Sequence, residues 1–237
     1  MPRTARKTPG GYAYHLLNRG VGRMRLFEDE GDYLAFEKVL AEGLVKYPGV
    51  RLCSFCVMPN HWHLVVWPEP GLDRVLSEWM RWVGTTHVRR WHEHRHSAGT
   101  GPIVQGRFKS FPIQAEDHFL TVCRYVERNA LRAKLCDAAE DWRWGSLGLR
   151  RAKVSALDEV EVALRASLVK LSDWPVAPGR SWRAKVNKPL GEKELEAVRL
   201  SLAKGRPLGD ERWVQKTAAK LGLAATLRGR GRPTKAG

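Results

Sequence analysis

The stretch that decides the fold is residues 50–67, VRLCSFCVMPNHWHLVVW. Two runs rich in β-branched and aromatic residues flank Met-Pro-Asn at 58–60, a combination typical of a turn. The pattern predicts a β-hairpin of two antiparallel strands. Because successive side chains of a strand point to opposite faces, His61 and His63 should share one face and Trp62 the other.

The sequence on either side of the hairpin completes a pattern of strands and helices. Apolar residues alternate over 12–19 and recur at helical spacing over 29–47, where Pro48-Gly49 ends the helix. The expected elements are strands at 12–19, 50–57, 61–67 and 107–113 and helices at 29–47, 72–92 and 116–135. This order predicts an α+β fold in which helices pack on an antiparallel sheet.

The chain changes character after about residue 150. A modest helical stretch to residue 171 precedes a polar linker with three prolines and then two weaker helices. From Pro178 to Gly237 there are fifteen Lys or Arg and five Asp or Glu, which gives this segment +10 of the total charge. We therefore expect a catalytic domain at 1–150 and a basic, mostly helical C-terminal extension at 151–237 that ends in a flexible Arg/Gly tail.

The composition favours a folded protein with a polyanionic partner. The 237 residues include ten tryptophans and carry 41 Lys or Arg against 25 Asp or Glu, a net charge of +16. Such a surplus binds phosphates with release of counterions, so nucleic acid is preferred over an anionic membrane surface or a generic basic protein. No apolar run approaches the ~18 residues of a membrane span, and the N-terminus lacks the apolar core of a signal peptide. We expect a cytoplasmic protein without a membrane partner.

The helix expected at 116–135 has an apolar stripe beside a polar stripe when residues are placed about 100° apart. The apolar stripe is Phe119, Cys123, Val126, Ala130 and Ala133, and the polar stripe is His118, Tyr125, Asn129 and Arg132. Tyr125 and Asn129 are neighbours at i and i+4. From the residues alone, Tyr125 could be a packing residue with its hydroxyl in water, and the two histidines of the hairpin could be structural.

Two other clusters of potential metal ligands are less favourable. Cys53 and Cys56 are three residues apart, which on a regular strand directs the two sulfurs to opposite faces and argues against zinc. The run from His92 to His96 lies at a Gly-flanked helix end among charged residues, which favours a solvated face. The chain has only four cysteines, in apolar surroundings, so we expect reduced core residues rather than a disulfide framework.

Four segments together resemble a known family. They are YHLLNRG at 14–20, MPNHWH at 58–63, QGRFKS at 105–110 and YVERNALRA at 125–133. In this order and spacing they closely resemble the REP-associated tyrosine transposases, which are relatives of the single-tyrosine HUH transposases of small bacterial insertion sequences. The resemblance covers roughly residues 12–150. Ala130-Leu131 departs from the proline and valine that relatives often carry, which concerns helix continuity rather than chemistry.

The resemblance implies a ferredoxin-like core and a role for each motif. His61 and His63 would be metal ligands, Asn129 a third polar ligand and Tyr125 the nucleophile. The cofactor would be a divalent cation, Mg²⁺ or Mn²⁺, with zinc as the rival. A tyrosine hydroxyl has a pKa near ~10, so a cation that polarises the phosphate would aid its attack. The product would be a covalent 5′-phosphotyrosine, which conserves the phosphodiester bond energy for rejoining.

The expected function is that of a transposase, a metal-dependent single-strand DNA endonuclease and strand transferase. Its partner would be single-stranded or hairpin DNA, in particular REP-like palindromes, bound by a monomer or a homodimer. The residues expected to contact DNA are Asn18, Arg19, Arg107, Lys109, Arg132, Arg228, Arg230 and Arg232. Two alternatives stay open, a catalytically silent DNA-hairpin-binding regulatory module and a hydrolytic metal nuclease that uses water. The segment 213–223 is a candidate for a small helical DNA-binding element.

Overall fold

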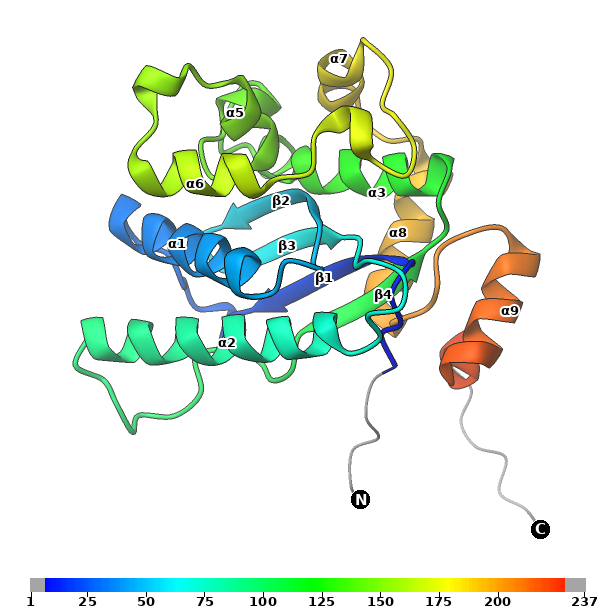
Figure 1. The fold of residues 1–237 in the computed structure, drawn as a ribbon, viewed down its shortest axis with the longest axis horizontal. Coiled ribbons are helices and arrows are strands. Elements are labelled where there is room, and N and C mark those ends of the chain that lie inside the picture. The colour runs from blue at the N-terminus through cyan, green and yellow to red at the C-terminus, as the bar shows by residue number, and fades with distance from the viewer. Residues whose placement is uncertain (1–6, 229–237) are drawn as a thin grey trace.

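A four-stranded antiparallel sheet forms the centre of the protein (Figure 1). The computed structural model describes residues 7–228. The strands are β1 (Ala13–Arg19), β2 (Leu52–Met58), β3 (His61–Val66) and β4 (Lys109–Ile113), in the spatial order β2-β3-β1-β4. Each pair of neighbours is antiparallel, and β3 lies between β1 and β2. This is the ferredoxin-like arrangement, and the predicted α+β class is confirmed.

Two helices cover one face of the sheet. They are α1 (Glu30–Lys46) and α2 (Val75–His94), and they pack over the larger of two apolar cores. The chain starts α1 at Asp29, whose carboxylate accepts a hydrogen bond from the Asp32 N–H at 3.0 Å, as a helix N-cap does. No helix within residues 7–228 has both the length and the apolar composition that crossing a membrane requires.

The opposite face carries α3 (Asp117–Glu127) and the short α4 (Asn129–Arg132). The expectation of a single continuous helix at 116–135 is therefore wrong. At Arg128 the backbone N–H bonds the carbonyls four and two residues before it, which tightens the turn and separates the two helices.

The burial of α3 also differs from the expected stripes. Tyr125 and Asn129, expected on the polar stripe, are only 6% and 0% exposed, whereas Ala133, expected on the apolar stripe, is exposed. Tyr125 is buried because its ring packs against His15 and His63 of the sheet. The C-terminal extension covers another side of α3. Trp174 contacts Phe119 edge-on, with 5.3 Å between the ring centroids. The helix that carries Tyr125 is thus covered on two sides.

The C-terminal extension is helical and contributes side chains to both apolar cores. Its helices are α5 (Ser146–Arg151), α6 (Glu159–Ser167), α7 (Trp182–Asn187), α8 (Glu192–Lys204) and α9 (Glu211–Leu221). Short 3₁₀ turns lie at Val21–Arg23, Ala139–Asp141, Val154–Ala156, Leu171–Asp173 and Ala224–Leu227. The helix α7 contacts α3, whereas α6 packs against α1 and places Leu164 in the larger core. In Figure 1, α9 lies beyond β4. A division of the chain near residue 150 stays a prediction.

A buried carboxylate joins α3 to the extension. Glu127 is 3% exposed and accepts hydrogen bonds from Ser146 Oγ at 2.6 Å and Trp182 Nε1 at 2.8 Å. Arg150 forms an ion pair with the same carboxylate at 3.1 Å. Burial raises the pKa of Glu127, and the guanidinium of Arg150 and the hydrogen bonds oppose that shift. Because a buried charge is costly unless it is paired, this group fixes α3 against the extension.

The expectation that Cys53 and Cys56 point to opposite faces is wrong. A β-bulge between Leu52 and Ser54 inserts Cys53 as an extra residue, which changes the alternation of side chains. Both thiols therefore lie in the core on the α3 face. Burial raises the pKa of each thiol to about 12, so both stay protonated and pack as small apolar side chains. The expected reduced state agrees with the free thiols of all four cysteines.

Candidate active site

The register of the sheet brings the histidine pair to the α3 face. Where β1 pairs with β3, His61 lies opposite Arg19 and His63 lies opposite Leu17. Leu17 in turn lies opposite Lys109 of β4. Trp62, between the two histidines, belongs to the core under α1 and α2. The two imidazoles therefore share one face and Trp62 the other, as the hairpin pattern predicts.

The histidines open into a cavity of about 400 Å³ lined by the sheet, α3 and α8. Of the residues expected to form the site, the cavity is lined by Asn18, Arg19, His61, His63, Arg107, Lys109, Tyr125 and Arg132. Asn129 and Arg228 do not line it, and Arg230 and Arg232 lie outside the described residues. Segments that are far apart in the sequence therefore converge on one cavity.

Tyr125 lies beside the histidine pair of its own chain. Its ring is edge-on to the His63 ring, with 5.7 Å between the centroids. The Arg132 guanidinium lies over the Tyr125 ring, 5.5 Å from its centroid. The phenol thus lies between an imidazole and a cation, and the cation interacts favourably with a phosphate or a phenolate.

A hydrogen bond determines which nitrogen of His61 carries the proton. His61 Nδ1 lies 2.6 Å from Asn60 Oδ1, and Asn60 Nδ2 donates to the Arg23 carbonyl at 3.3 Å. Because an amide oxygen only accepts, Nδ1 of a neutral His61 carries the hydrogen and Nε2 keeps its lone pair. Burial, followed by Arg19 and Arg132, lowers the pKa of His61 to about 4. His61 is therefore neutral at neutral pH, as a metal ligand must be.

His63 has a second histidine as its neighbour. His63 Nδ1 lies 2.8 Å from His15 Nε2, and both side chains are almost completely buried. Burial, followed by His15, His61, Arg132 and Arg19, holds the pKa of His63 well below its ordinary value. Sequence reasoning gave His15 no role, although it lies within the first of the four motifs. The available signal was its position on β1, two residues before Leu17 and on the same face.

Asn129 does not face the cavity. Its side chain is 0% exposed, and its Oδ1 accepts a hydrogen bond from Arg132 Nη2 at 2.8 Å. Its Nδ2 is buried without a hydrogen-bond partner among the residues that the structure describes. To act as a third metal ligand, Asn129 would have to release Arg132. The role expected for Asn129 stays a prediction.

The donor set fits a divalent cation that takes few of its ligands from the protein. Within residues 7–228, no group of three or more His, Cys, Asp or Glu side chains is arranged to hold a metal ion. The available ligands are the Nε2 atoms of His61 and His63, and no carboxylate lines the cavity. Mg²⁺ commonly binds through few protein ligands together with substrate phosphate oxygens and water. A phosphate would also offset the repulsion between the cation and the arginines around it.

The extension contributes residues to the site that sequence reasoning missed. Arg199, Leu202 and Ala203 of α8 line the cavity, together with Gln105 from the loop before β4. The cations around the cavity are Arg19, Arg107, Lys109, Arg132 and Arg199. Arg199 could not be assigned from the sequence because its helix carries charges on most of its surface, and only long-range packing turns this face toward the cavity.

The remaining candidate residues lie elsewhere. His92, in the histidine-rich run at the end of α2, is hydrogen-bonded through its two ring nitrogens to Ser97 Oγ at 2.9 Å and to the Gly101 carbonyl at 3.1 Å. Its role is therefore local. Arg228 is exposed, and its carbonyl accepts a hydrogen bond from Lys204 Nζ at 2.9 Å.

Comparison with known protein families identifies this arrangement. The family described as "Transposase IS200 like" matches residues 10–129. The chain belongs to the IS200-like transposase family. The matched range includes His61, His63 and Tyr125, so all three lie within the part of the chain that defines the family. The resemblance that the four motifs carry is confirmed.

One solved structure supports the fold. The chain is similar to a REP-associated tyrosine transposase bound to a REP hairpin, with 17% identity and a TM-score of 0.53 over 68% of this chain and 90% of that chain. It also matches a candidate transposase from Deinococcus radiodurans R1, with 18% identity and a TM-score of 0.35 over 57% of this chain and 93% of that chain. The comparison with curated proteins gave no match.

Proposed function

We propose that this IS200-like transposase is a metal-dependent single-strand DNA endonuclease and strand transferase that acts through a phosphotyrosine at Tyr125. The observation that carries the proposal is the meeting of Tyr125, His61 and His63 in one cationic cavity. The three residue types have complementary uses there, since a phenol can attack phosphorus and two imidazoles can hold a cation.

The proposed reaction is a transfer of the DNA phosphate to tyrosine. The Tyr125 hydroxyl oxygen forms a bond to phosphorus and loses its proton to water. The bond between phosphorus and the 3′ oxygen of the preceding nucleotide breaks, and that oxygen takes up a proton to leave as a 3′ hydroxyl. A cation on His61 and His63 would supply polarisation of the phosphate when bound. The reverse attack by a second 3′ hydroxyl joins strands without another energy source.

The basic side chains have a separate task. Arg19, Lys109 and Arg132 surround the cavity from three elements, so they can pair with the phosphate under attack and its neighbours. Arg199 adds a cation from α8 on the side opposite the sheet. Charge-assisted hydrogen bonds to phosphate are the stronger kind, which suits a site that must align an extended strand.

A second cavity supports a path for the DNA beyond the cleavage point. It measures about 1300 Å³, lies between α2 and the sheet, and shares Asn18 and Arg107 with the catalytic cavity. Arg81 and Lys220 add positive charge to its lining, and the partly buried Phe108 adds an aromatic surface. Bases of single strands stack on aromatic rings while cations follow the backbone. The similar transposase of known structure is bound to a REP hairpin, which supports a hairpin substrate here.

The test is a search for the covalent intermediate. Wild-type protein, Mn²⁺ and end-labelled hairpin DNA with single-stranded flanks should yield a denaturation-resistant protein–DNA adduct. Tyr125→Phe should lose adduct and cleavage by at least about 10³-fold, because loss of a nucleophile is among the most damaging changes in an enzyme. Tyr47→Phe, at the end of α1 and outside the cavity, is the matched control and should retain both.

The alternatives give different results in the same experiment. Binding of the hairpin without cleavage in the wild type supports a regulatory DNA-binding module. Cleavage without an adduct, retained in Tyr125→Phe, identifies water as the nucleophile.

The proposal also uses Tyr125 and the histidines of a single chain, since Tyr125 contacts His63 of its own chain.

A further inference from the structure

His15 is a buried histidine that none of the proposed chemistry uses directly. It is 0% exposed and packs between the rings of His63 and Phe111, with 4.9 Å and 5.0 Å between the centroids. Its Nε2 lies 2.8 Å from His63 Nδ1. Its Nδ1 is buried and has no hydrogen-bond partner among the described residues. Since an unpaired buried polar atom reduces stability, its presence in a core calls for an explanation.

Only two proton arrangements of neutral imidazoles satisfy the contact between the two histidines. Either His15 Nε2 donates to His63 Nδ1, or His63 Nδ1 donates to His15 Nε2. In the first arrangement, the second nitrogen of His63 carries a hydrogen and cannot bind a cation. In the second, His63 Nε2 keeps its lone pair. The contact thus decides whether His63 can be a ligand.

The surroundings favour the second arrangement. His63 lines the cavity, and Arg19 and Arg132 act on it as positive charges. The unprotonated nitrogen is the negative end of the imidazole dipole, so it is stabilised when it faces these cations, whereas an N–H would be repelled. Asn60 imposes the equivalent arrangement on His61.

We propose that His15 is a positioning residue that accepts the Nδ1–H of His63 and thereby keeps Nε2 of His63 unprotonated and directed to the cavity. Its effect on cation binding rests on the proposed function, but the proton arrangement itself does not. Residues that orient a ligand histidine in this way raise metal affinity without touching the metal. The unpaired Nδ1 of His15 is the stability cost of this arrangement.

Two substitutions separate positioning from packing. His15→Phe keeps an aromatic ring but offers no acceptor to His63. His15→Gln places an amide oxygen near the position of the imidazole Nε2 and can accept the same hydrogen bond. His87→Phe is the matched control, because His87 is equally buried between the aromatic rings of Phe27 and Phe36 on the opposite face of the sheet.

The first measurement is the proton arrangement in the metal-free protein, by long-range ¹H–¹⁵N NMR of the imidazoles. Wild-type His63 should carry its hydrogen on Nδ1, His15→Phe should lose this preference, and His15→Gln should keep it. His63 protonated on Nε2 in the wild type overturns the proposal, whatever the protein does to DNA. So does an unchanged His63 spectrum in His15→Phe.

The second measurement is Mn²⁺ affinity in a hairpin complex of the Tyr125→Phe background, which cannot consume its DNA through the tyrosine. His15→Phe should weaken Mn²⁺ binding by about 10- to 100-fold, as loss of a residue behind a metal ligand does. His15→Gln should recover most of that loss, and His87→Phe should cause none. An unchanged affinity in His15→Phe overturns the positioning role. A wild type that forms no adduct instead refutes the proposed function and leaves the NMR result standing.

Discussion

The two faces of the sheet are built from the same strands but do different work. Toward α1 and α2 the strands present large apolar side chains such as Phe55, Trp62 and Leu64, each almost completely buried. Toward α3 they present His15 and His63 together with sulfur-containing residues and a few larger apolar side chains such as Phe111 and Ile113. Alternation along β3 is the clearest case, because Trp62 lies between two imidazoles that face the other way. The face toward α1 and α2 thus contributes more to the free energy of folding than the face toward α3, which buries polar groups.

The two faces also differ in the surroundings of their buried histidines. On the α1 and α2 face, His87 packs among aromatic rings, away from the catalytic cavity. On the α3 face, His63 is equally buried but connects through His15 on one side and to the cavity on the other. Burial alone therefore does not distinguish the two histidines. The access of one ring nitrogen to a cavity does.

The largest effect expected from this contrast is a change at Trp62. Trp62→Ala should lower the free energy of unfolding by about 3 to 5 kcal/mol, because it leaves a cavity in the larger core. His61→Ala, one residue away, should change that free energy by less than about 1 kcal/mol, since His61 is only partly buried. Urea denaturation gives both values. Adduct formation should fall steeply in His61→Ala, and equal destabilisation by the two variants would contradict the division between the faces.

The difference between the faces also explains what the sequence could predict. The hairpin, the histidine pair and the succession of strands and helices along the chain follow from local patterns, because alternation and turn residues act over a few positions. The closing of the α3 face could not be predicted. It depends on Trp174 and Trp182, which join the core from a segment that looks like a polar linker. The contact of His15 with His63 likewise depends on the pairing of β1 with β3, which are distant in the sequence. The bulge at Cys53 lies within the hairpin, but it interrupts the regular alternation from which the faces of the strand were predicted.

The next effect concerns the joint between α3 and the extension. Glu127→Gln should lower the free energy of unfolding by about 1.5 to 3 kcal/mol, the range for hydrogen bonds to a charged group, because the amide cannot pair with Arg150 as the carboxylate does. Glu196→Gln, on the exposed surface of α8, is the control and should be neutral. Denaturation should remain a single transition in both. A separate early transition for residues after 150 would show that the extension folds independently of the sheet.

A smaller effect is expected from pH. Burial, partly offset by Asp32 and reinforced by Arg95, lowers the pKa of His87 from 6.5 to about 4. The unfolded chain takes up this proton below about pH 6.5 and the folded protein only below about pH 4, so acid favours unfolding. Stability should be constant above pH 7 and fall between pH 6.5 and 4. His87→Phe removes one such proton and should reduce the slope by about 1.4 kcal/mol per pH unit.

The same titration can be made on the other face. Burial lowers the pKa of His15 to about 3, so His15→Phe should reduce the slope in the same direction. Urea midpoints at pH 7, 6 and 5 measure both variants against the wild type. The slope of unfolding free energy against pH could be unchanged in His87→Phe but reduced in His15→Phe. The two buried histidines would then differ in their protonation, and the difference between the two faces would be one of hydration rather than of access to the cavity.

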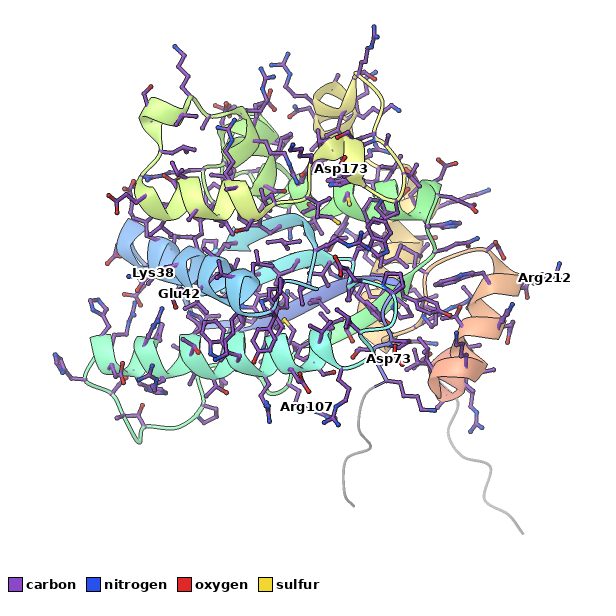
Figure 2. The ribbon with its side chains drawn as sticks, viewed as in Figure 1. Lys38, Glu42, Asp73, Arg107, Asp173 and Arg212 are labelled. Atoms are coloured by element: carbon purple, nitrogen blue, oxygen red, sulfur yellow. The ribbon has the colours of Figure 1, made fainter. Side chains whose placement is uncertain are left out.

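The smallest effect is expected at a single phosphate contact. Arg107 is exposed and lines both the cavity at the histidine pair and the larger cavity beside α2. Arg107→Ala should therefore weaken binding of hairpin DNA several-fold. It should also lower the slope of log affinity against log salt concentration by about 0.7. Lys38→Ala is the matched control, because Figure 2 shows Lys38 on α1, away from Arg107. Fluorescence anisotropy between low and moderate salt measures both slopes. Lys38 and Arg107 carry the same charge, so an equal change in the two variants would mean that DNA affinity depends only on the net charge of the protein. A change confined to Arg107→Ala would place the DNA strand along the side of the sheet where the two cavities meet.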